Sequence, residues 1–285
     1  MKRNAFIFFI ALVFLFGYTV VQISQYSSDK LTIVFCDVGQ GDAIFIRTPA
    51  KTDILIDGGP DKSVLDCLSH NMPFWDKTID LIVLTHPHAD HMTGLVSVIE
   101  RYKVLSFYDS NERPNDEIYA LLMQKLADKN LSARKLARGN NFKDSSGMRF
   151  RIFWPRLKSS DEVKQNISNN DLNSLSSVGI LKFGNFSVLF TGDAESEILK
   201  NFAAEIGDVN ILKVPHQGSS GALTDEILEI IKPELAVILV GENNRYGHPS
   251  RDTVELLKKH KVKVLRTDID GEIKVASNGK TYWTY

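Results

Sequence analysis

The sequence predicts an α+β fold in which two β-sheets pack face to face and helices cover the outside. Segments typical of strands and helices recur in two similar successions, one in each half of the chain, and strands in both halves end in polar loops. The most distinctive loop follows the apolar run at 81–84, where three histidines and one aspartate crowd into positions 86–91. We expect functional residues to gather at these strand ends.

Composition limits the classes of protein that this chain can belong to. With 285 residues, 43% of them hydrophobic, the chain can bury a full core in one large domain or two small ones. Its formal net charge is −1, from 34 basic and 35 acidic residues. No global positive field attracts nucleic acid, so a polyanion would have to be held by a local patch or by metal.

The amino terminus has the pattern of a membrane segment. A positively charged start at 1–3 precedes an uncharged, Phe-rich apolar stretch at 5–21, which is long enough for a secretory signal or a single span. No A-x-A cleavage pattern precedes 27–30. We therefore expect residues 1–30 to be an uncleaved membrane anchor with the positive end inside, and residues 31–285 to be an extracytoplasmic domain. A cleaved signal, which would make the protein secreted, and a buried helix are the alternatives.

In the first half, β-branched and aromatic runs separated by Gly, Pro and Asp turns predict a meander that continues into alternating strands and helices. Strands are expected at 31–35, 43–47, 53–56, 79–84, 104–108, 132–136 and 148–153, and helices at 63–70, from 92 onward and at 115–129. Residues 139–147 are rich in turn formers, and the polar stretch at 155–170 is expected to be a mobile loop.

The second half begins again with strands. The Gly184-Asn185 pair is typical of a hairpin turn. Strands are expected at 178–183, 186–190, 210–214, 235–240 and in short pieces from 262 to the end, and helices from 195, at 223–231 and at 251–260. Pro233 ends the middle helix.

The chain contains two cysteines, Cys36 and Cys67. An exported protein could join them, but a core of this size does not require a disulfide. Because Cys36 lies in an apolar strand pattern, we expect it to be a small core residue, and the sequence leaves the redox state of the pair open.

The H-x-H-x-D-H run at 86–91 predicts a metal site. His86 and His88 point the same way if the chain leaves its strand extended, whereas Asp90 and His91 lie one turn further on and can serve a second ion. Imidazoles and a carboxylate suit divalent ions such as Zn²⁺, Mn²⁺ or Fe²⁺. The alternative is a run of exposed histidines that caps a strand, and the crowding of three of the seven histidines argues against it.

A two-metal site needs ligands from elsewhere in the chain. Asp193 follows a strand in Thr-Gly-Asp, where its carboxylate could bridge both ions or could simply cap a helix. His216 also follows an apolar strand and could complete the second site. His248 could contact substrate or be a turn residue, whereas His70 and His260 have no acidic neighbours and are expected to be surface or core histidines.

Several motifs occur in the order known from one protein family. They are FCDVGQGDA at 35–43, LIDGG at 55–59, THPHADH at 85–91, FTGD at 190–193 and KVPH at 213–216, extended by Asn173 with Ser176, GENN at 241–244, YGHP at 246–249 and RTD at 266–268. Together they resemble the metallo-β-lactamase superfamily, specifically the branch carried by ComEC-type competence proteins. The resemblance implies a four-layer αββα sandwich with the site along one edge.

The sequence departs from that family in three ways. The multi-span channel of full-length competence proteins is not among these residues, so we expect a stand-alone hydrolase domain rather than a DNA channel. No histidine lies between His91 and His216, although the ComEC-like branch also lacks that third histidine and has an Asn/Ser segment nearby, here Asn173 and Ser176. The branch usually has a second histidine where this chain has Gln217, so that histidine is dispensable or activity is altered.

The resemblance implies two divalent ions, Zn²⁺ or Mn²⁺. We assign one ion to His86, His88 and Asp193, and its neighbour to Asp90, His91, Asp193 and His216. The expected catalytic residues are Asp90, Asp193 and Asp57, and Asp57 is expected to orient a ligand histidine from behind. Residues expected beside the ligands or the substrate are Asp37, Asp42, Asn173, Ser176 and His248, although Asp37 and Asp42 could instead be turn formers.

The favoured function is an exported or membrane-tethered metal-dependent phosphodiesterase, specifically a ComEC-like DNA nuclease with a role in DNA uptake during competence. DNA would be held by the metal ions and by a local basic patch. Its candidate residues are Arg134, Lys135, Arg138, Arg149, Arg151 and Arg156, which could equally form a solvated edge. The alternatives are an extracytoplasmic phosphodiesterase acting on teichoic acid, lipid head groups or small phosphoesters, and a non-catalytic metal-binding module.

Overall fold

The computed structural model describes residues 2–26, 29–110, 112–156 and 172–285. Most of the polar stretch that we expected to be a mobile loop lies outside the described residues.

The first sheet contains eight strands among the described residues, in the order β17-β16-β1-β2-β3-β5-β7-β8. In that order they span Tyr282–Thr284, Ile273–Ser277, Leu31–Phe35, Ile44–Arg47, Asp53–Ile56, Leu81–Val83, Phe107–Asp109 and Ala133–Lys135. The strands from β17 to β3 pair antiparallel, and β3, β5, β7 and β8 pair parallel. This sheet therefore has one meandering half and one parallel half.

The second sheet repeats this plan with seven strands in the described residues, in the order β15-β14-β13-β12-β11-β10-β9. In that order they span Lys263–Arg266, Leu235–Ile238, Ile211–Lys213, Phe186–Phe190, Val178–Phe183, Arg149–Trp154 and Asn141–Lys143. Here β9 to β12 pair antiparallel, and β12 to β15 pair parallel. A small parallel pair, β4 (Thr78–Ile79) with β6 (Lys103–Val104), lies apart from both sheets.

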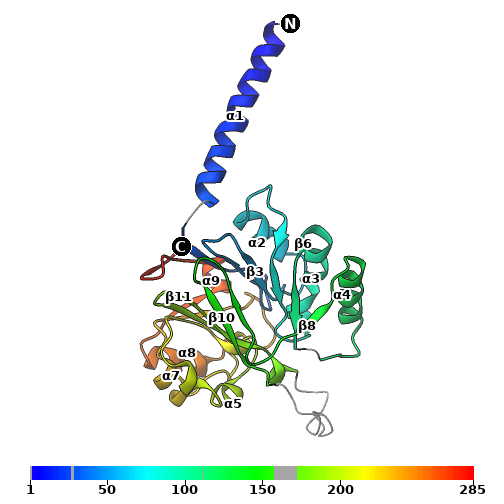
Figure 1. Ribbon diagram of the computed structural model, residues 1–285. Coiled ribbons are helices and arrows are strands. Elements are labelled where there is room, and N and C mark those ends of the chain that lie inside the picture. The colour runs from blue at the N-terminus through cyan, green and yellow to red at the C-terminus, as the bar shows by residue number, and fades with distance from the viewer. Residues whose placement is uncertain (1, 27–28, 111, 157–171) are drawn as a thin grey trace.

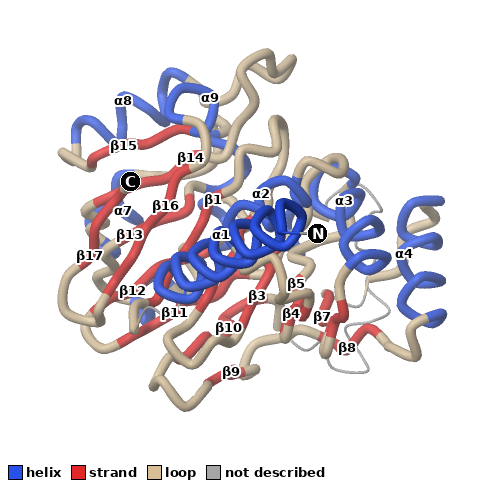
Figure 2. The backbone as a smooth tube through the Cα atoms, turned by 90° about the horizontal axis from the view of Figure 1, so that it is seen from above, coloured by secondary structure: helices blue, strands red, loops and turns tan. Residues whose placement is uncertain are grey.

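Helices cover the outer face of each sheet (Figures 1 and 2). On the first sheet they are α2 (Val64–Asn71), α3 (Ala89–Arg101) and α4 (Glu117–Asp128). On the second sheet they are α5 (Ser196–Leu199), α6 (Ala203–Ile206), α7 (Asp225–Ile231) and α8 (Arg251–Lys259). The expected α+β sandwich with four αββα layers is confirmed.

Alternation along the strands explains this layering. In β1, the side chains of Ile33 and Phe35 belong to the hydrophobic cluster between the sheets, whereas Val34 belongs to the cluster under α2, α3 and α4. In β12, Val188 likewise faces the central cluster and Leu189 faces the cluster under α5 to α8. Because successive strand residues point to opposite faces, apolar residues on both faces produce a sheet that is covered on both sides.

Several element boundaries differ from the sequence-based expectation. Helix α3 begins at Ala89 rather than at 92, with His88 extended at its N-cap and Asp90 in its first turn. A negative charge there is favourable beside the positive end of the helix. The turn-rich segment at 139–147 contains strand β9, and a short helix, α9 (Thr267–Asp270), follows β15. Isolated two- to four-residue elements lack the periodicity from which they could be predicted.

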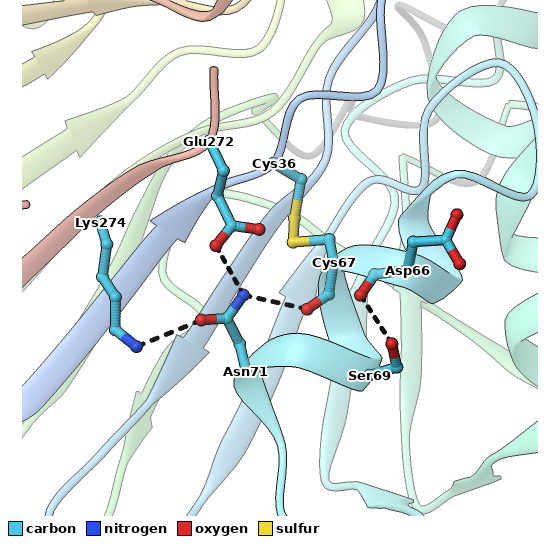
Figure 3. The surroundings of a disulfide bond; sticks show 7 residues. All are labelled: Cys36, Asp66, Cys67, Ser69, Asn71, Glu272 and Lys274. Atoms are coloured by element: carbon cyan, nitrogen blue, oxygen red, sulfur yellow. Dashed lines mark hydrogen bonds between the residues drawn. A yellow bond between two sulfur atoms is a disulfide. The ribbon is translucent and has the colours of Figure 1, made fainter. Parts of the chain in front are cut away.

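Cys36 and Cys67 form a disulfide that ties the end of β1 to α2 (Figure 3). Beside it, Asn71 donates to the Cys67 carbonyl oxygen at 3.0 Å and to Glu272 at 2.9 Å. Cys36 is fully buried, as expected of a core residue, but its covalent partner was left open by the sequence. The bond joins residues that are 31 positions apart, which come into contact after the chain has passed through β2 and β3 and α2 has packed on the sheet.

The first helix, α1 (Lys2–Tyr26), projects away from the sandwich (Figure 1). Its segment Asn4–Val21 has a mean hydropathy of 2.3, and none of it is buried against the rest of the protein. An 18-residue apolar helix is long enough to cross a bilayer, and secretory signals share the same pattern.

Candidate metal centre

The predicted ligands lie at the carboxyl ends of parallel strands from both sheets. Asp57 follows β3 and His86 follows β5, which is its parallel neighbour in the first sheet. Asp193 follows β12 and His216 follows β13, which are parallel neighbours in the second sheet. Because the carboxyl ends of parallel strands meet at one edge, the two halves deliver their side chains to a common edge of the sandwich.

The centre of the cluster is the Asp193 carboxylate, which is 2% exposed. Its Oδ2 atom lies 3.8 Å from His86 Nε2, 3.4 Å from His91 Nε2 and 3.8 Å from His216 Nε2. Three imidazole nitrogens from two sheets therefore converge on one carboxylate oxygen. The position agrees with a carboxylate that bridges two ions.

Two of these imidazoles have their other nitrogen held by a carboxylate. His91 Nδ1 lies 2.8 Å from Asp57 Oδ2, and His216 Nδ1 lies 2.7 Å from Glu195 Oε1. An Nδ1–H that donates to a carboxylate fixes the tautomer in which Nε2 carries the free lone pair, which is the arrangement found behind metal-ligating histidines. The orienting position predicted for Asp57 is therefore occupied, and Glu195 holds an equivalent position that the sequence reasoning missed.

Buried polar groups also hold Asp57 and His86 in position. Asp57 accepts hydrogen bonds from the Thr85 backbone N–H and hydroxyl, both at 2.7 Å. Ser176 Oγ lies 3.3 Å from His86 Nδ1 and accepts the Asp193 backbone N–H at 2.8 Å. Ser176, expected near the site, thus links a histidine of the first sheet to the carboxylate of the second.

The remaining members of the histidine run lie nearer the surface. His88 Nδ1 is 3.0 Å from His86 Nε2, and Asp90 Oδ2 is 3.8 Å from His91 Nε2. Gln217 Nε2 donates to Asp90 Oδ2 at 3.0 Å. The residue that replaces the family's second histidine therefore holds an expected ligand in place.

The charges of the cluster shift the pKa values of its members. Burial lowers the pKa of His91, but the Asp193 and Asp57 carboxylates outweigh it and hold that pKa well above its ordinary value. Burial raises the pKa of Asp193, but His91, His86 and Lys213 hold it well below the ordinary value. The hydrogen bond to Glu195 raises the pKa of His216. The unliganded site therefore retains protons that a bound cation would displace.

The donor set fits a divalent cation. His91 Nε2 and Asp193 Oδ1 are buried and have no hydrogen-bond partner within the described part of the chain. Ligand atoms of His86, His91 and Asp193 all lie within 4.8 Å of one another. Leaving such atoms without partners is costly, and a cation that accepts their lone pairs removes the cost.

Lys213 is a buried member of the site for which the sequence reasoning proposed no role. Its side chain is fully buried, forms an ion pair with Asp42, lies 3.9 Å from Asp193 Oδ1 and donates to the Gly192 carbonyl oxygen at 2.8 Å. A lone lysine inside the apolar run at 211–214 was the available signal, because a lysine is almost never fully buried unless it is paired. Asp42 is therefore a charge partner in the site, not a turn former.

The structure places the other predicted residues at different distances from the cluster. Asn173 Nδ2 lies 3.4 Å from His216 Nε2, and the ring of His248 lies 5.5 Å from that of His216. Asp37 is exposed and accepts a weak hydrogen bond from Gly39 N at 3.3 Å, which is the behaviour of a turn former. The expectation that His260 has no acidic neighbour is wrong, since its Nε2 lies 2.7 Å from Asp225 on the surface.

The predicted basic patch is partly neutralised. Arg138 and Arg151 each form a 2.7 Å ion pair with the same residue, Glu205. Arg134 lies over the Tyr108 ring at 5.9 Å. The alternation of exposed arginines with buried residues in β10 places Arg149 on the outer face of the second sheet together with Arg151.

Comparison with known proteins identifies the class. The family model described as metallo-beta-lactamase superfamily matches residues 36–242, and the chain belongs to that superfamily. The match contains the histidine run, Asp193 and His216, which are the residues that the fold brings together.

The curated relatives are competence and recombination proteins. The chain is 28% identical to ComE operon protein 3 of Bacillus subtilis over 83% of its own length and 32% of that protein. It is 24% identical to Recombination protein 2 of Haemophilus influenzae over 92% of its length and 31% of that protein. It is similar to ComEC-type competence proteins, as the motifs predicted, and spans about a third of the length of these relatives.

Solved structures share the fold at low sequence identity. YhfI of Bacillus subtilis, a metallo-β-lactamase fold protein, has a TM-score of 0.56 at 11% identity and covers 90% of this chain and 100% of its own. Zn²⁺-bound PqqB of Methylobacterium extorquens has a TM-score of 0.53 at 10% identity, and the match covers 82% of this chain and 97% of PqqB. A diphosphatase of the PhnP family has a TM-score of 0.51 at 14% identity, and the match covers 87% of this chain and 98% of the diphosphatase. These likenesses show the fold alone.

Proposed function

We propose that this protein is a membrane-tethered, metal-dependent phosphodiesterase whose catalytic body lies outside the cytoplasm and whose substrate is DNA. The observation that carries the proposal is the convergence of three oriented imidazoles on Asp193. The residues that would hold two ions are His86, His88, Asp90, His91, Asp193 and His216. When bound, divalent ions such as Zn²⁺ or Mn²⁺ supply Lewis-acid activation of a phosphoryl group and of water.

The chain's own residues have supporting tasks in this proposal. Asp57 and Glu195 orient the ligand histidines His91 and His216 by accepting from their Nδ1 atoms. Lys213 contributes a fixed positive charge behind Asp193, which balances part of the cluster's negative charge. Asn173 and His248 flank His216 and are the side chains best placed to contact a phosphoester.

The choice of DNA rests on the competence relatives and on local charge. Arg149 pairs with Lys182 at the opposite end of its sheet from Asp193. Because Arg138 and Arg151 are paired with Glu205, DNA contacts would come mainly from the metal centre and from Arg134 and Lys135, at the carboxyl end of β8. Such contacts weaken with salt, because phosphate binding releases counterions. Retention of the buried cluster argues against a non-catalytic module.

The test uses the full chain in detergent, stripped of metal and resupplied with Mn²⁺ or Zn²⁺. Single-stranded DNA, duplex DNA and bis-p-nitrophenyl phosphate are assayed side by side, with Asp90→Ala as the inactive control. Metal-dependent DNA cleavage that the substitution abolishes supports the nuclease. Turnover of the small ester alone redirects the substrate to wall or lipid phosphodiesters, and metal binding without any turnover overturns the enzymatic proposal.

A further inference from the structure

Two groups of exposed aromatic side chains flank the base of α1. The first group is Phe74 and Trp75, with 53% and 47% of their surfaces exposed, and the second is Trp283 and Tyr285, with 39% and 71%. We call these four residues the aromatic rim. Figure 1 shows α1 leaving the body close to the carboxyl terminus, which carries the second pair.

Direct contacts connect the first group to α1 itself and the second group to the chain just after α1. The ring of Tyr18, in α1, stacks on Phe74 with centroids 6.1 Å apart, and Phe74 meets Trp75 edge-on at 4.9 Å. The Lys30 ammonium lies 4.9 Å above the ring of Trp283. The rim therefore contacts the chain both before and after Tyr26, where α1 ends.

The position of Tyr18 sets the level of the rim relative to the apolar segment. Tyr18 lies three residues inside the carboxyl end of the apolar window, which ends at Val21. At 1.5 Å per residue, this is about 4.5 Å into the apolar stretch. A body residue that stacks on Tyr18 therefore lies level with the last turn of the candidate span.

The exposure of Phe74 and Trp75 results from a fixed turn. Asp76 closes the turn by donating its backbone N–H to the Pro73 carbonyl oxygen at 2.9 Å, and its carboxylate accepts from Arg47 at 3.0 Å and from Thr78 N at 3.2 Å. A turn pinned in this way holds two large apolar rings in water, which is unfavourable unless another surface covers them.

The chemistry of the rim selects a bilayer as that surface. Trp and Tyr favour the boundary between head groups and acyl chains because their rings are apolar at one end and polar at the other. The exposed lysines Lys77 and Lys103 lie beside the turn, joined through the Lys103 N–H to Lys77 carbonyl bond of 2.7 Å, and suit phosphate head groups.

We propose that the aromatic rim inserts into the head-group region of the bilayer that α1 spans, and so fixes the body against the membrane surface. The proposal rests on the membrane-tethered part of the proposed function. It commits to a phospholipid surface as the occupant, with a protein partner as the competing outcome of the test.

The test places the full chain in vesicles of phosphatidylcholine and phosphatidylglycerol that carry a spin label near the head group. Tryptophan quenching is compared among the wild type, Trp75→Phe, Trp283→Phe and the double variant. Both substitutions are at exposed positions and leave the three hydrophobic clusters intact. The third tryptophan, Trp154, is held within the body by a 2.6 Å bond from its Nε1 to the Ser174 carbonyl oxygen.

We expect strong quenching in the wild type, a partial loss in each single variant and a complete loss in the double variant. Trp154→Phe is the matched control and should keep the quenching. Protein that floats with the vesicles but shows no quenching at Trp75 overturns the rim while the anchor stands, and leaves the surface to a protein partner. If the protein does not float with the vesicles, α1 is not a membrane anchor and the proposal of the rim fails with it. The result of the phosphodiesterase assay does not depend on this outcome.

Discussion

The first half of the sandwich supplies four candidate ligands from one six-residue run, whereas the second half supplies single residues from two different strands. Asp193 follows β12 and His216 follows β13, so neither residue meets the histidines of the first half until the two sheets pack together. In the first half the ligands are local, so the loop and the start of α3 preassemble them. In the second half they depend on tertiary structure.

The two halves also differ in how they are reinforced. The first half is joined by the Cys36–Cys67 disulfide. The second half has a buried cation instead, because Lys213 lies between Asp42, in the loop between β1 and β2, and Asp193, in the loop after β12. The ligand-rich half is therefore held by a covalent link, and the joint between the halves is held by charge. Substitutions in each half should therefore fail in different ways.

The largest effect is expected from Lys213→Met, which removes the cation and leaves Asp42 and Asp193 buried together. Removing one partner of a buried pair costs about 3–5 kcal/mol in the free energy of unfolding. Urea unfolding in the presence of a chelator measures the loss. Adding Asp42→Asn should recover part of it, and Mn²⁺ or Zn²⁺ should recover more.

Lys182→Met is the matched control, because Lys182 lies on β11 of the same sheet but is exposed. A surface substitution of this kind should change stability by less than about 0.5 kcal/mol. Equal effects at positions 182 and 213 would show that the buried cation does not join the halves.

Removal of the disulfide tests the reinforcement of the first half. Cys36→Ser with Cys67→Ser releases a loop closed across 31 residues, which corresponds to about 3–4 kcal/mol in the chain-entropy model. Reduction of the wild type should produce the same shift in the urea midpoint. Because neither cysteine is among the proposed ligands, metal stoichiometry in the folded double variant should stay unchanged. A variant as stable as the wild type would refute the structural role.

The two halves also differ in how many of their site residues the sequence predicts. His86, His88, Asp90 and His91 were found because they are neighbours in the chain, and the strands were found from their period-two apolar pattern. Asp193 and His216 were candidates because each follows an apolar strand, but the sequence left open whether Asp193 is a ligand or a helix cap, and the family motifs favoured the ligand.

The rest could not be predicted, because it depends on distances between remote residues. Glu195 supports His216 and Lys213 pairs with Asp42 only after the strands of two sheets are in place. Likewise, Cys67 becomes the partner of Cys36 only once α2 packs on the sheet.

Gly192→Ala tests the loop that carries Asp193 in the second half. Gly192 has φ +49°, and an added Cβ would overlap Ser176 Oγ, the atom that accepts the Asp193 N–H. We expect a loss of about 1–3 kcal/mol from the strained backbone and at least about tenfold weaker metal binding. Titration calorimetry with Mn²⁺ measures the second quantity.

Gly207→Ala separates strain from displacement of the ligand. Gly207 has φ +67°, but no heavy atom lies within 4 Å of the position that an added methyl group would take, so the substitution should cost stability without weakening metal binding. Equal losses of metal affinity at both glycines would contradict the role assigned to the Ser176 contact.

The prediction that both halves share, and the one that needs no substitution, is the pH dependence of metal binding. The pKa of His216 is raised by Glu195, and that of His91 is held high by Asp193 and Asp57 against the effect of burial. Below these raised values the imidazoles carry protons that a cation must displace, so affinity should fall as pH falls, by about tenfold per pH unit for each proton. Calorimetry in buffers of different ionisation enthalpy counts the protons released.

The metal-free protein should respond to pH in the opposite direction. A histidine whose pKa is higher in the folded state than the ordinary 6.5 stabilises the fold below that ordinary value, and the contribution is lost as pH rises through the folded pKa. Raising the pH above 6.5 should therefore weaken the metal-free protein while strengthening metal binding, because the ligand histidines whose pKa burial lowers, His86 and His88, titrate below that pH. Glu195→Gln removes the partner of His216 from the second half alone, and should reduce both trends without abolishing either, because His91 keeps its own carboxylates. A variant with no change in either trend would show that His216 takes no part in holding the proton or the cation.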